Sequence, residues 1–409
     1  MKKFLLTIIL ILGIANSALS QKIAEQDLVG FPDSCKVSLI TCYPGPLVYE
    51  LYGHTAIRVK SDYGDLAYNF GMFSFNKPNF MYTFVKGETD YMLGYTPFDG
   101  DRYYNFINEY RYRGSRIVEQ ELNISNEKAV QLWKRLHILS LPENREYRYN
   151  YVLDNCATRP RDMIESLVGG LKYPVPADTT LSFRDIMAAH SPNYPWYQFG
   201  IDLALGSGID YTVTTRQQQF APVLLMEAMA KATYTDENGK ETPIVAKTNI
   251  INEGTGNAIL PPTPWYLSPL FIALILMIAI GYASYRDIKR GKVSKWIDCI
   301  WFTATGLLGS LITFLVFASE HEATSPNYLI FWLNPLCFIA SLLIWIKSLR
   351  KWVVYYHFIN FAVVLILFAF WWAIPQCANT AIFPMVAITL MRSATNITTF
   401  RNAKKKTDK

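Results

Sequence analysis

One histidine and one cysteine have the types and the setting that a thiol enzyme requires. His54 lies in the run Tyr-Gly-His-Thr-Ala-Ile-Arg at 52–58, and Cys156 follows Asp-Asn at 154–155, where a helix is expected to begin. The positive end of a helix dipole lowers the pKa of a thiol, and a neighbouring imidazole can remove the thiol proton. The pair therefore predicts nucleophilic catalysis by a thiol. The competing interpretation is a buried, inert cysteine, because cysteine is often a small core residue.

A third polar residue is expected beside the histidine. Alternation along a strand at 51–60 places His54 on the face opposite to the apolar side chains. On a second strand, at 66–71, Asn69 shares a face with small residues. Antiparallel pairing of these strands would bring Asn69 next to His54, where a side-chain amide can orient the imidazole.

Other kinds of site have little support in the sequence. Cysteine and histidine do not occur at metal-binding spacing, and there is neither a G-x-S-x-G elbow nor a glycine-rich phosphate loop. We therefore expect no metal and no cofactor. In an oxidising compartment Cys35 and Cys42 could form a disulfide, which would leave Cys156 as the free thiol.

The N-terminus predicts secretion. Lys2 and Lys3 precede an apolar run at 4–15, and Ala-Leu-Ser at 18–20 supplies small residues for cleavage. Residues 1–20 are therefore expected to be a removed signal peptide, because the apolar run is too short to span a bilayer. The segment that follows would begin outside the cytoplasm.

The C-terminal part predicts a membrane bundle. The chain is 51% hydrophobic and only 18% charged, with a mean hydropathy of +0.11. Apolar stretches near the length of a membrane span lie at 265–285, 297–318, 328–346, 353–374 and 381–397. Lysine and arginine gather after the first, third and fifth stretches, so these loops and the tail at 398–409 are expected to be cytoplasmic. The net charge of +6 is concentrated in these loops and the tail, at the edges of the membrane, and gives no support to nucleic-acid binding.

The segment between the signal peptide and the membrane bundle predicts one domain of the α+β class, large enough to hold a catalytic site. Residues 21–231 suffice for a single core, and 232–264 are polar and rich in turn residues, which predicts a linker. Besides the two strands named above, we expect strands at 36–42 and 115–124 and helices at 126–139 and 157–168.

The motifs resemble a known group of enzymes. Histidine on an early strand, a polar residue on the next strand and an Asn-Cys helix start resemble the circularly permuted papain-like thiol enzymes, which include bacterial cell-wall amidases and lecithin:retinol acyltransferase-like proteins. The sequences at 52–58, 68–71 and 154–161 look more specifically like the periplasmic domain of the Lnb-type lipoprotein N-acyltransferases, in which a small bundle of transmembrane helices follows. The resemblance covers nearly the whole mature chain.

The resemblance implies a permuted papain-like domain with Cys156 as nucleophile and His54 as its base. It also implies a function, the transfer of an acyl chain from a phospholipid to the N-terminal amine of diacylglyceryl lipoproteins through a cysteine thioester. The expected partners are the phospholipid donor, the lipoprotein acceptor and the inner membrane, with the catalytic domain on the periplasmic side. The alternatives are a membrane-tethered cell-wall amidase or peptidase and a non-enzymatic membrane scaffold.

Further residues are expected to assist this chemistry. Candidates for stabilising the oxyanion or orienting the reacting groups are Asn155, the backbone N–H of Ala157, and Tyr52. Candidates for binding the phosphate headgroup are Arg58, Arg159 and Arg161.

Overall fold

The computed structural model describes residues 32–73, 78–100, 104–255 and 260–407. The expected signal peptide at 1–20 lies outside them. The chain divides into two compact units, which we describe separately. The first comprises Met1–Lys77, Thr89–Thr179 and Thr214–Ile259, and the second comprises Pro78–Glu88, Thr180–Val213 and Leu260–Lys409.

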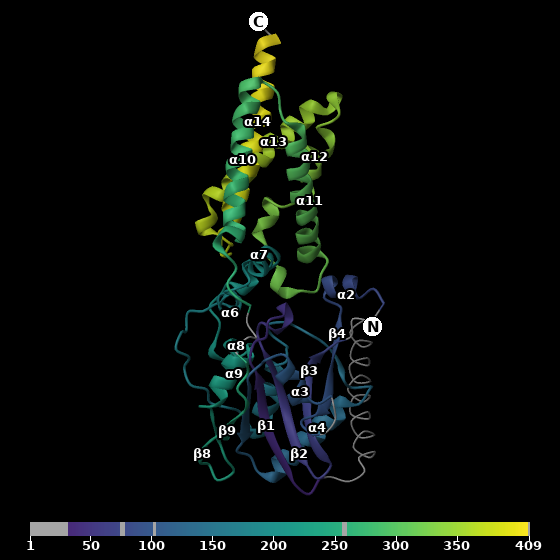
Figure 1. Ribbon diagram of the computed structural model, residues 1–409, viewed down its shortest axis with the longest axis vertical. Helices are drawn as coiled ribbons and strands as arrows, with labels where there is room; N and C mark the ends of the chain where they lie inside the picture. The colour runs from purple at the N-terminus through teal and green to yellow at the C-terminus, as the bar shows by residue number, and fades with distance from the viewer. Residues whose placement is uncertain (1–31, 74–77, 101–103, 256–259, 408–409) are drawn as a thin grey trace, which may run out of the picture. The chain divides into compact units, whose positions relative to one another are not determined.

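The first unit is built on an antiparallel sheet of seven strands (Figure 1). In spatial order the strands are β6 (Glu146–Arg148), β4 (Asp90–Pro97), β3 (Gly64–Met72), β2 (His54–Ser61), β1 (Cys35–Cys42), β5 (Ile117–Leu122) and β9 (Val245–Asn252). Strands β1, β2, β3 and β5 correspond to the four strands expected from sequence. A separate hairpin pairs β7 (Thr233–Thr235) with β8 (Glu241–Pro243).

Helices cover both faces of this sheet. The larger core joins Ile57 and Val59 of β2 to apolar side chains of α4 (Asn126–Ser140), α5 (Thr158–Val168) and α9 (Pro222–Met229). Ala56 of β2 belongs to a second core, which includes residues of α3 (Phe106–Tyr112). The expected alternation along β2 is therefore present, and the mixed α+β class is confirmed. A short helix, α8 (Thr215–Gln218), completes the set.

The expected linker at 232–264 is wrong for much of its length. Strand β9 pairs with β5, and the β7–β8 hairpin lies in the same segment. The polar composition of the segment led to the wrong prediction, because an edge strand needs few apolar side chains. Four of the eight side chains of β9 are partly buried and four are exposed. Residues 180–213, which we expected in the catalytic domain, belong to the second unit.

The second unit is helical. Its elements are α2 (Phe80–Lys86), α6 (Phe183–Ala189), α7 (Pro195–Ala204), α10 (Pro269–Arg290), α11 (Lys295–Phe317), α12 (Cys337–Leu343), α13 (Arg350–Ala369) and α14 (Ile382–Thr407). Leu203 of α7 lies in one apolar core with Ile312 of α11, Val364 of α13 and Val386 of α14. A buried Arg184 in α6 pairs with Asp202 at 2.9 Å, so α6 and α7 form a compact cap within this unit.

Three helices in the described part of the chain are long and apolar enough to cross a membrane: Pro269–Arg290, Lys295–Phe317 and Lys347–Ala369. They fall on the first, second and fourth expected spans. The third expected span, 328–346, contains only the seven-residue helix α12, preceded by a 3-10 turn at Tyr328–Phe331. Asn334 and Pro335 lie between the two, and proline disfavours a continuous helix there.

The fifth expected span coincides with the continuous helix α14, which runs through Pro384 and Arg392. The fully buried Arg392 forms ion pairs with Asp298 of α11 at 2.5 Å and Asp287 of α10 at 2.9 Å. Its charge is thus compensated inside the bundle, as a buried charge requires. Five crossings with a cytoplasmic C-terminus stay a prediction.

Candidate active site

His54 and Asn69 meet on neighbouring strands. The ladder between β2 and β3 pairs Ala56 with Asn69, so His54 and Asn69 lie on one face of the sheet. The imidazole Nε2 lies 3.1 Å from the amide Oδ1 of Asn69. The Nδ2 of Asn69 donates to the carbonyl of Ala67 at 3.3 Å, which directs Oδ1 toward the imidazole. Nε2 therefore carries the proton, and Nδ1 of His54 keeps a lone pair.

The opposite side of the imidazole is supported by α3. The ring of His54 stacks on that of Tyr110, with 6.0 Å between centroids and 10° between planes. Arg113, one residue beyond α3, pairs with the buried Glu50 at 3.0 Å. These contacts hold the ring in one orientation, as a catalytic base requires.

The thiol of Cys156 reaches the beginning of β2. It is hydrogen-bonded to the backbone N–H of Thr55, the residue after His54, and to the hydroxyl of Tyr149. Thr55 pairs with Thr41 of β1, whereas the β2–β3 ladder ends one residue later, at Ala56. The structure thus places the thiol of Cys156 beside Thr55, the residue that follows His54 in the chain.

A bulge in β3 makes room for this approach. The pairing between β3 and β4 shifts between Asn69 and Met72, where β3 has one extra residue. Gly71 lies in this bulge with a φ of +89°, which favours glycine. A Cβ at this position would lie 3.3 Å from the ring of Tyr149 and 3.8 Å from the Cβ of Cys156. The missing side chain therefore leaves space for both residues.

Burial shifts the pKa values of both partners of the proposed pair toward their uncharged forms. Burial raises the pKa of the Cys156 thiol above its ordinary value, and the hydrogen bonds from Thr55 and Tyr149 offset only part of this effect. Burial lowers the pKa of His54 to about 4, against a smaller opposite effect of the Asn69 hydrogen bond. The expectation that the helix dipole lowers the thiol pKa is therefore wrong. Helix α5 begins at Thr158, two residues after the thiol, and desolvation dominates.

Tyr149 is a candidate functional residue that sequence reasoning missed. Its hydroxyl is hydrogen-bonded to the backbone N–H of Cys156 as well as to the thiol. Its ring stacks on Tyr91 of β4, with 4.2 Å between centroids. The one available signal was the alternation of tyrosines at 147, 149 and 151, seven to eleven residues before α5 begins at Thr158.

The groups that we expected to stabilise the oxyanion form other hydrogen bonds. Asn155 Oδ1 accepts from the backbone N–H groups of Ala157 at 2.8 Å and Thr158 at 3.0 Å, so the N–H of Ala157 is already occupied. Asn155 Nδ2 donates to the carbonyls of Tyr151 and Phe220. The N-cap of α5 is Ala157, so Asn155 binds the first N–H groups from a position two residues before the cap. These contacts use the whole hydrogen-bonding capacity of its amide and leave no group for an oxyanion.

Tyr52, the remaining expected donor, lies close to the same loop. It is largely buried, and its ring packs edge to face on Tyr151 with 5.3 Å between centroids. Packing of this kind orients the loop that leads to Cys156.

The three arginines expected to bind headgroups are committed to internal ion pairs. Arg58 binds Asp65 at 2.5 Å and Glu119 at 2.7 Å. Arg159 binds Asp154 through two nitrogens, and its guanidinium lies 3.5 Å from the ring centre of Tyr147.

Arg161 is nearly fully buried, and it binds Asp162 and the carbonyl of Arg216. Three of these partners lie within seven residues of their arginine, whereas Glu119 and the carbonyl of Arg216 come from distant segments. Paired guanidinium groups have little capacity left for a phosphate, and the headgroup role of the three arginines stays a prediction.

The expected disulfide does not form. Cys35 and Cys42 are both free thiols at opposite ends of β1. Seven steps along a strand separate their Cα atoms by about 23 Å, whereas a disulfide needs Cα atoms within about 7 Å. Among the described residues, no group of three His, Cys, Asp or Glu side chains could hold a metal ion.

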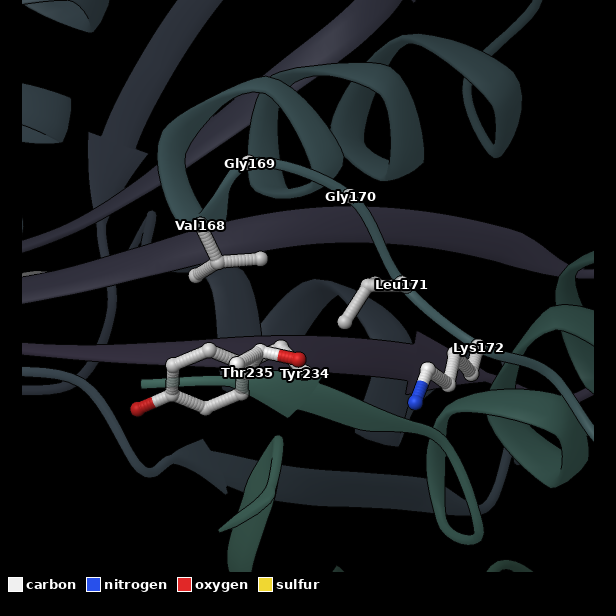
Figure 2. A pocket seen from close by; sticks show the side chains of 7 residues that line it. All are labelled: Val168, Gly169, Gly170, Leu171, Lys172, Tyr234 and Thr235. Carbon is white, nitrogen blue, oxygen red and sulfur yellow. The ribbon is translucent and has the colours of Figure 1, made fainter. Parts of the chain in front are cut away.

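A pocket of about 250 Å³ lies at the other end of α5 from Cys156 (Figure 2). Its lining comes from the end of that helix and from β7, and comprises Val168, Gly169, Gly170, Leu171, Lys172, Tyr234 and Thr235. Helix α5 has 11 residues, so about 16 Å of helix separates this pocket from the thiol. It is not part of the candidate active site.

Comparison with known families matches most of the chain. Residues 31–184 match the family model described as the Lnb N-terminal periplasmic domain. Residues 262–405 match the one described as the Lnb transmembrane domain. Comparison with curated proteins and with solved structures gives no significant match. The two family matches include the candidate active site and the helical bundle, in the order in which they occur along the chain.

Proposed function

Because this chain belongs to the Lnb-type lipoprotein N-acyltransferase family, we propose that it transfers an acyl chain from a phospholipid to the N-terminal amine of diacylglyceryl lipoproteins. The observation that carries the proposal is the approach of the Cys156 thiol to the backbone of Thr55, next to a histidine whose tautomer is fixed by Asn69. Cys156 is the proposed nucleophile, His54 the base, and Asn69 the residue that orients the base.

The first proposed step forms a thioester. Nδ1 of His54 takes the proton from the thiol while the sulfur attacks the carbonyl carbon of a phospholipid ester. The tetrahedral intermediate collapses with cleavage of the ester C–O bond. The protonated imidazole gives its proton to the leaving alkoxide, which departs as a lysophospholipid. The low pKa of His54 favours this return of the proton.

The negative oxygen of the intermediate requires donors near the sulfur. The backbone N–H of Cys156 and the hydroxyl of Tyr149 are both at this position and bind one another in the resting enzyme. We assign them the stabilisation of the oxyanion, because a hydroxyl can rotate toward the oxyanion and the oxyanion can replace it as the acceptor of the Cys156 N–H.

The second proposed step transfers the chain to nitrogen. The α-amine of the lipoprotein attacks the thioester carbonyl, and His54 takes the proton that the amine loses. The C–S bond then breaks, the sulfur recovers the proton, and an amide is released. The free enzyme is restored without a cofactor.

The location of the protein suits this reaction. A periplasmic N-terminal domain followed by a transmembrane domain makes the chain an inner-membrane protein. Both proposed substrates carry acyl chains and stay in the bilayer, so a catalytic domain tethered to that bilayer meets both of them. A soluble cell-wall substrate would not require the tether.

The test compares four proteins in cells that lack the native activity: wild type, Cys156→Ala, His54→Ala and Tyr91→Phe. Mass spectrometry of lipoprotein N-terminal peptides measures the amide-linked acyl chain. We expect the chain with wild type and Tyr91→Phe and its loss in the other two variants, provided that all four accumulate equally in the membrane. Unchanged N-acylation in both Cys156→Ala and His54→Ala overturns the proposal. Activity of the wild type on peptidoglycan instead would favour the amidase alternative.

A further inference from the structure

Helix α2 presents an apolar surface that the fold leaves uncovered. It is inserted in sequence between strands β3 and β4 of the first unit, yet it belongs to the helical unit. None of its seven residues is buried. The exposed fraction is 70% for Met81, 58% for Tyr82 and 43% for Phe84. Side chains of this kind in water are unfavourable unless a partner covers them.

The helix is fixed to the end of α11. The backbone N–H of Glu320 donates to the carbonyl of Lys86 at 2.8 Å, and Nε2 of His321 lies 2.9 Å from the carbonyl of Phe84. Gly87, with a φ of +80°, ends α2 where a Cβ would lie 3.3 Å from the backbone of Glu320. The bonds use backbone groups of α2 and leave its apolar side chains outward.

The end of α11 marks a membrane boundary. Helix α11 is long and apolar enough to cross a bilayer, and its last residue, Phe317, is 76% exposed. The ring of Tyr82 lies 6.4 Å from that of Phe314, one turn earlier in α11. Figure 1 shows α2 beside the lower end of α11. Aromatic side chains gather where a spanning helix leaves the hydrocarbon and enters the headgroup layer.

From these contacts we propose that α2 is a lipid-surface anchor, with Met81, Tyr82 and Phe84 inserted in the periplasmic leaflet of the membrane. The partner is the phospholipid bilayer rather than a protein, because the apolar surface of α2 continues that of a spanning helix. Lys86, the one charged residue of α2, forms an ion pair with Glu88 at its C-terminal end, so the inserted side chains carry no charge. Insertion of a short amphipathic segment to this depth is typical of interfacial helices.

In the chain, the anchor lies between the strands that carry the candidate active site. Strand β3, which precedes α2, contains Asn69 and the bulge at Gly71, and β4, which follows α2, contains Tyr91. The proposal concerns membrane contact and stands whether or not the acyl transfer is correct.

The test uses the full-length protein in nanodiscs of phosphatidylethanolamine and phosphatidylglycerol. A photoreactive p-benzoylphenylalanine replaces Met81 in one protein and Phe84 in a second. In a third it replaces Tyr63, an exposed aromatic residue in the turn at the other end of β3. After irradiation, intact-mass measurement distinguishes adducts of lipid mass from adducts of protein mass. Because both positions in α2 are exposed, the substitutions are compatible with folding.

We expect lipid adducts from positions 81 and 84 at a yield at least about tenfold above that from position 63. Absence of lipid adducts at both positions in α2, or an equal yield at position 63, overturns the proposal. Adducts of protein mass at positions 81 and 84 would overturn it in favour of a protein partner. None of these readouts depends on enzymatic activity, so a failure of the anchor is distinguishable from a failure of the proposed reaction.

Discussion

The amide oxygen of Asn69 lies 3.1 Å from Nε2 of His54. This contact joins two strands through residues 15 positions apart, and it fixes which imidazole nitrogen is free. Substitution Asn69→Ala would release the ring and allow the other tautomer. We expect acyl transfer to fall on the order of 10²-fold, measured as lysophospholipid release by the full-length protein in nanodiscs.

Asn69→Asp is the informative companion to that variant. A carboxylate can still accept from Nε2, so it should retain more activity than alanine does. It should also raise the pKa of His54, because a negative charge favours the protonated imidazole. Equal rates for Asn69→Ala and the wild type would contradict the orienting role.

Tyr149 should matter through its hydroxyl and not through its ring. Tyr149→Phe keeps the stacking on Tyr91 and removes the hydrogen bonds to Cys156. Loss of one oxyanion donor costs about 10² to 10³ in rate, and we expect a decrease of that order in both lysophospholipid release and N-acylation. The matched control is Tyr91→Phe, which also loses one hydroxyl from the stacked pair. A similar loss in both variants would show a packing effect and not an oxyanion donor.

The resting state of the thiol should be visible in its alkylation. The pKa of Cys156 is raised above the ordinary value of 9.0 and that of His54 is lowered to about 4, so the two groups stay uncharged between these limits. Alkylation by iodoacetamide requires the thiolate. The rate at Cys156, followed by peptide mass spectrometry, should therefore stay low near neutral pH and rise only in alkaline solution.

His54→Ala tests whether the imidazole influences the protonation state of the Cys156 thiol. If the imidazole is neutral at rest, its removal leaves the alkylation profile of Cys156 unchanged in position. A thiolate–imidazolium pair would behave differently, with fast alkylation below about pH 6 that disappears in His54→Ala. That second pattern would refute the neutral pair.

Asn155 should affect stability before it affects chemistry. Its Oδ1 accepts from the backbone N–H groups of Ala157 and Thr158 at the start of α5, and its Nδ2 donates to the carbonyl of Phe220 at 3.0 Å. Asn155→Ala should lower the free energy of unfolding by about 2 kcal/mol, because buried backbone groups lose their partners. Thermal unfolding of the full-length protein in detergent measures this change. Asn155→Asp should also destabilise the fold, because it keeps the acceptor for the two N–H groups but sets a carboxylate against the carbonyls of Tyr151 and Phe220, which lose their donors.

Local sequence patterns predicted the elements that carry the site. Alternation located β2 and β3, and apolar spacing located α4, whose buried face consists of Ala129, Leu132, Trp133 and Leu136. Ser125 caps that helix by accepting from the N–H of Lys128. These features depend on neighbours within a few residues, so a single sequence contains them.

Features that depend on distant segments escaped prediction. The pairing of Arg58 with Glu119 joins residues 61 positions apart, and nothing local in the sequence distinguishes such an arginine from a ligand-binding one. The position of Tyr149 depends on a bulge in β3, and the place of 180–213 in the helical unit depends on distant contacts such as that of Asp202 with Asn379. The pKa of the Cys156 thiol is raised and not lowered, because burial removes the thiol from water, and burial is a property of the folded structure.

The most direct test of the central claim is to look for the acyl chain on the sulfur. Full-length protein is mixed with phospholipid in the absence of lipoprotein, quenched in acid and digested, and the peptide containing Cys156 is weighed. We predict a mass increase of one acyl chain that neutral hydroxylamine removes, and its absence in His54→Ala. Continued N-acylation of lipoproteins with no acyl adduct on Cys156, or with the adduct on another residue, would contradict the account.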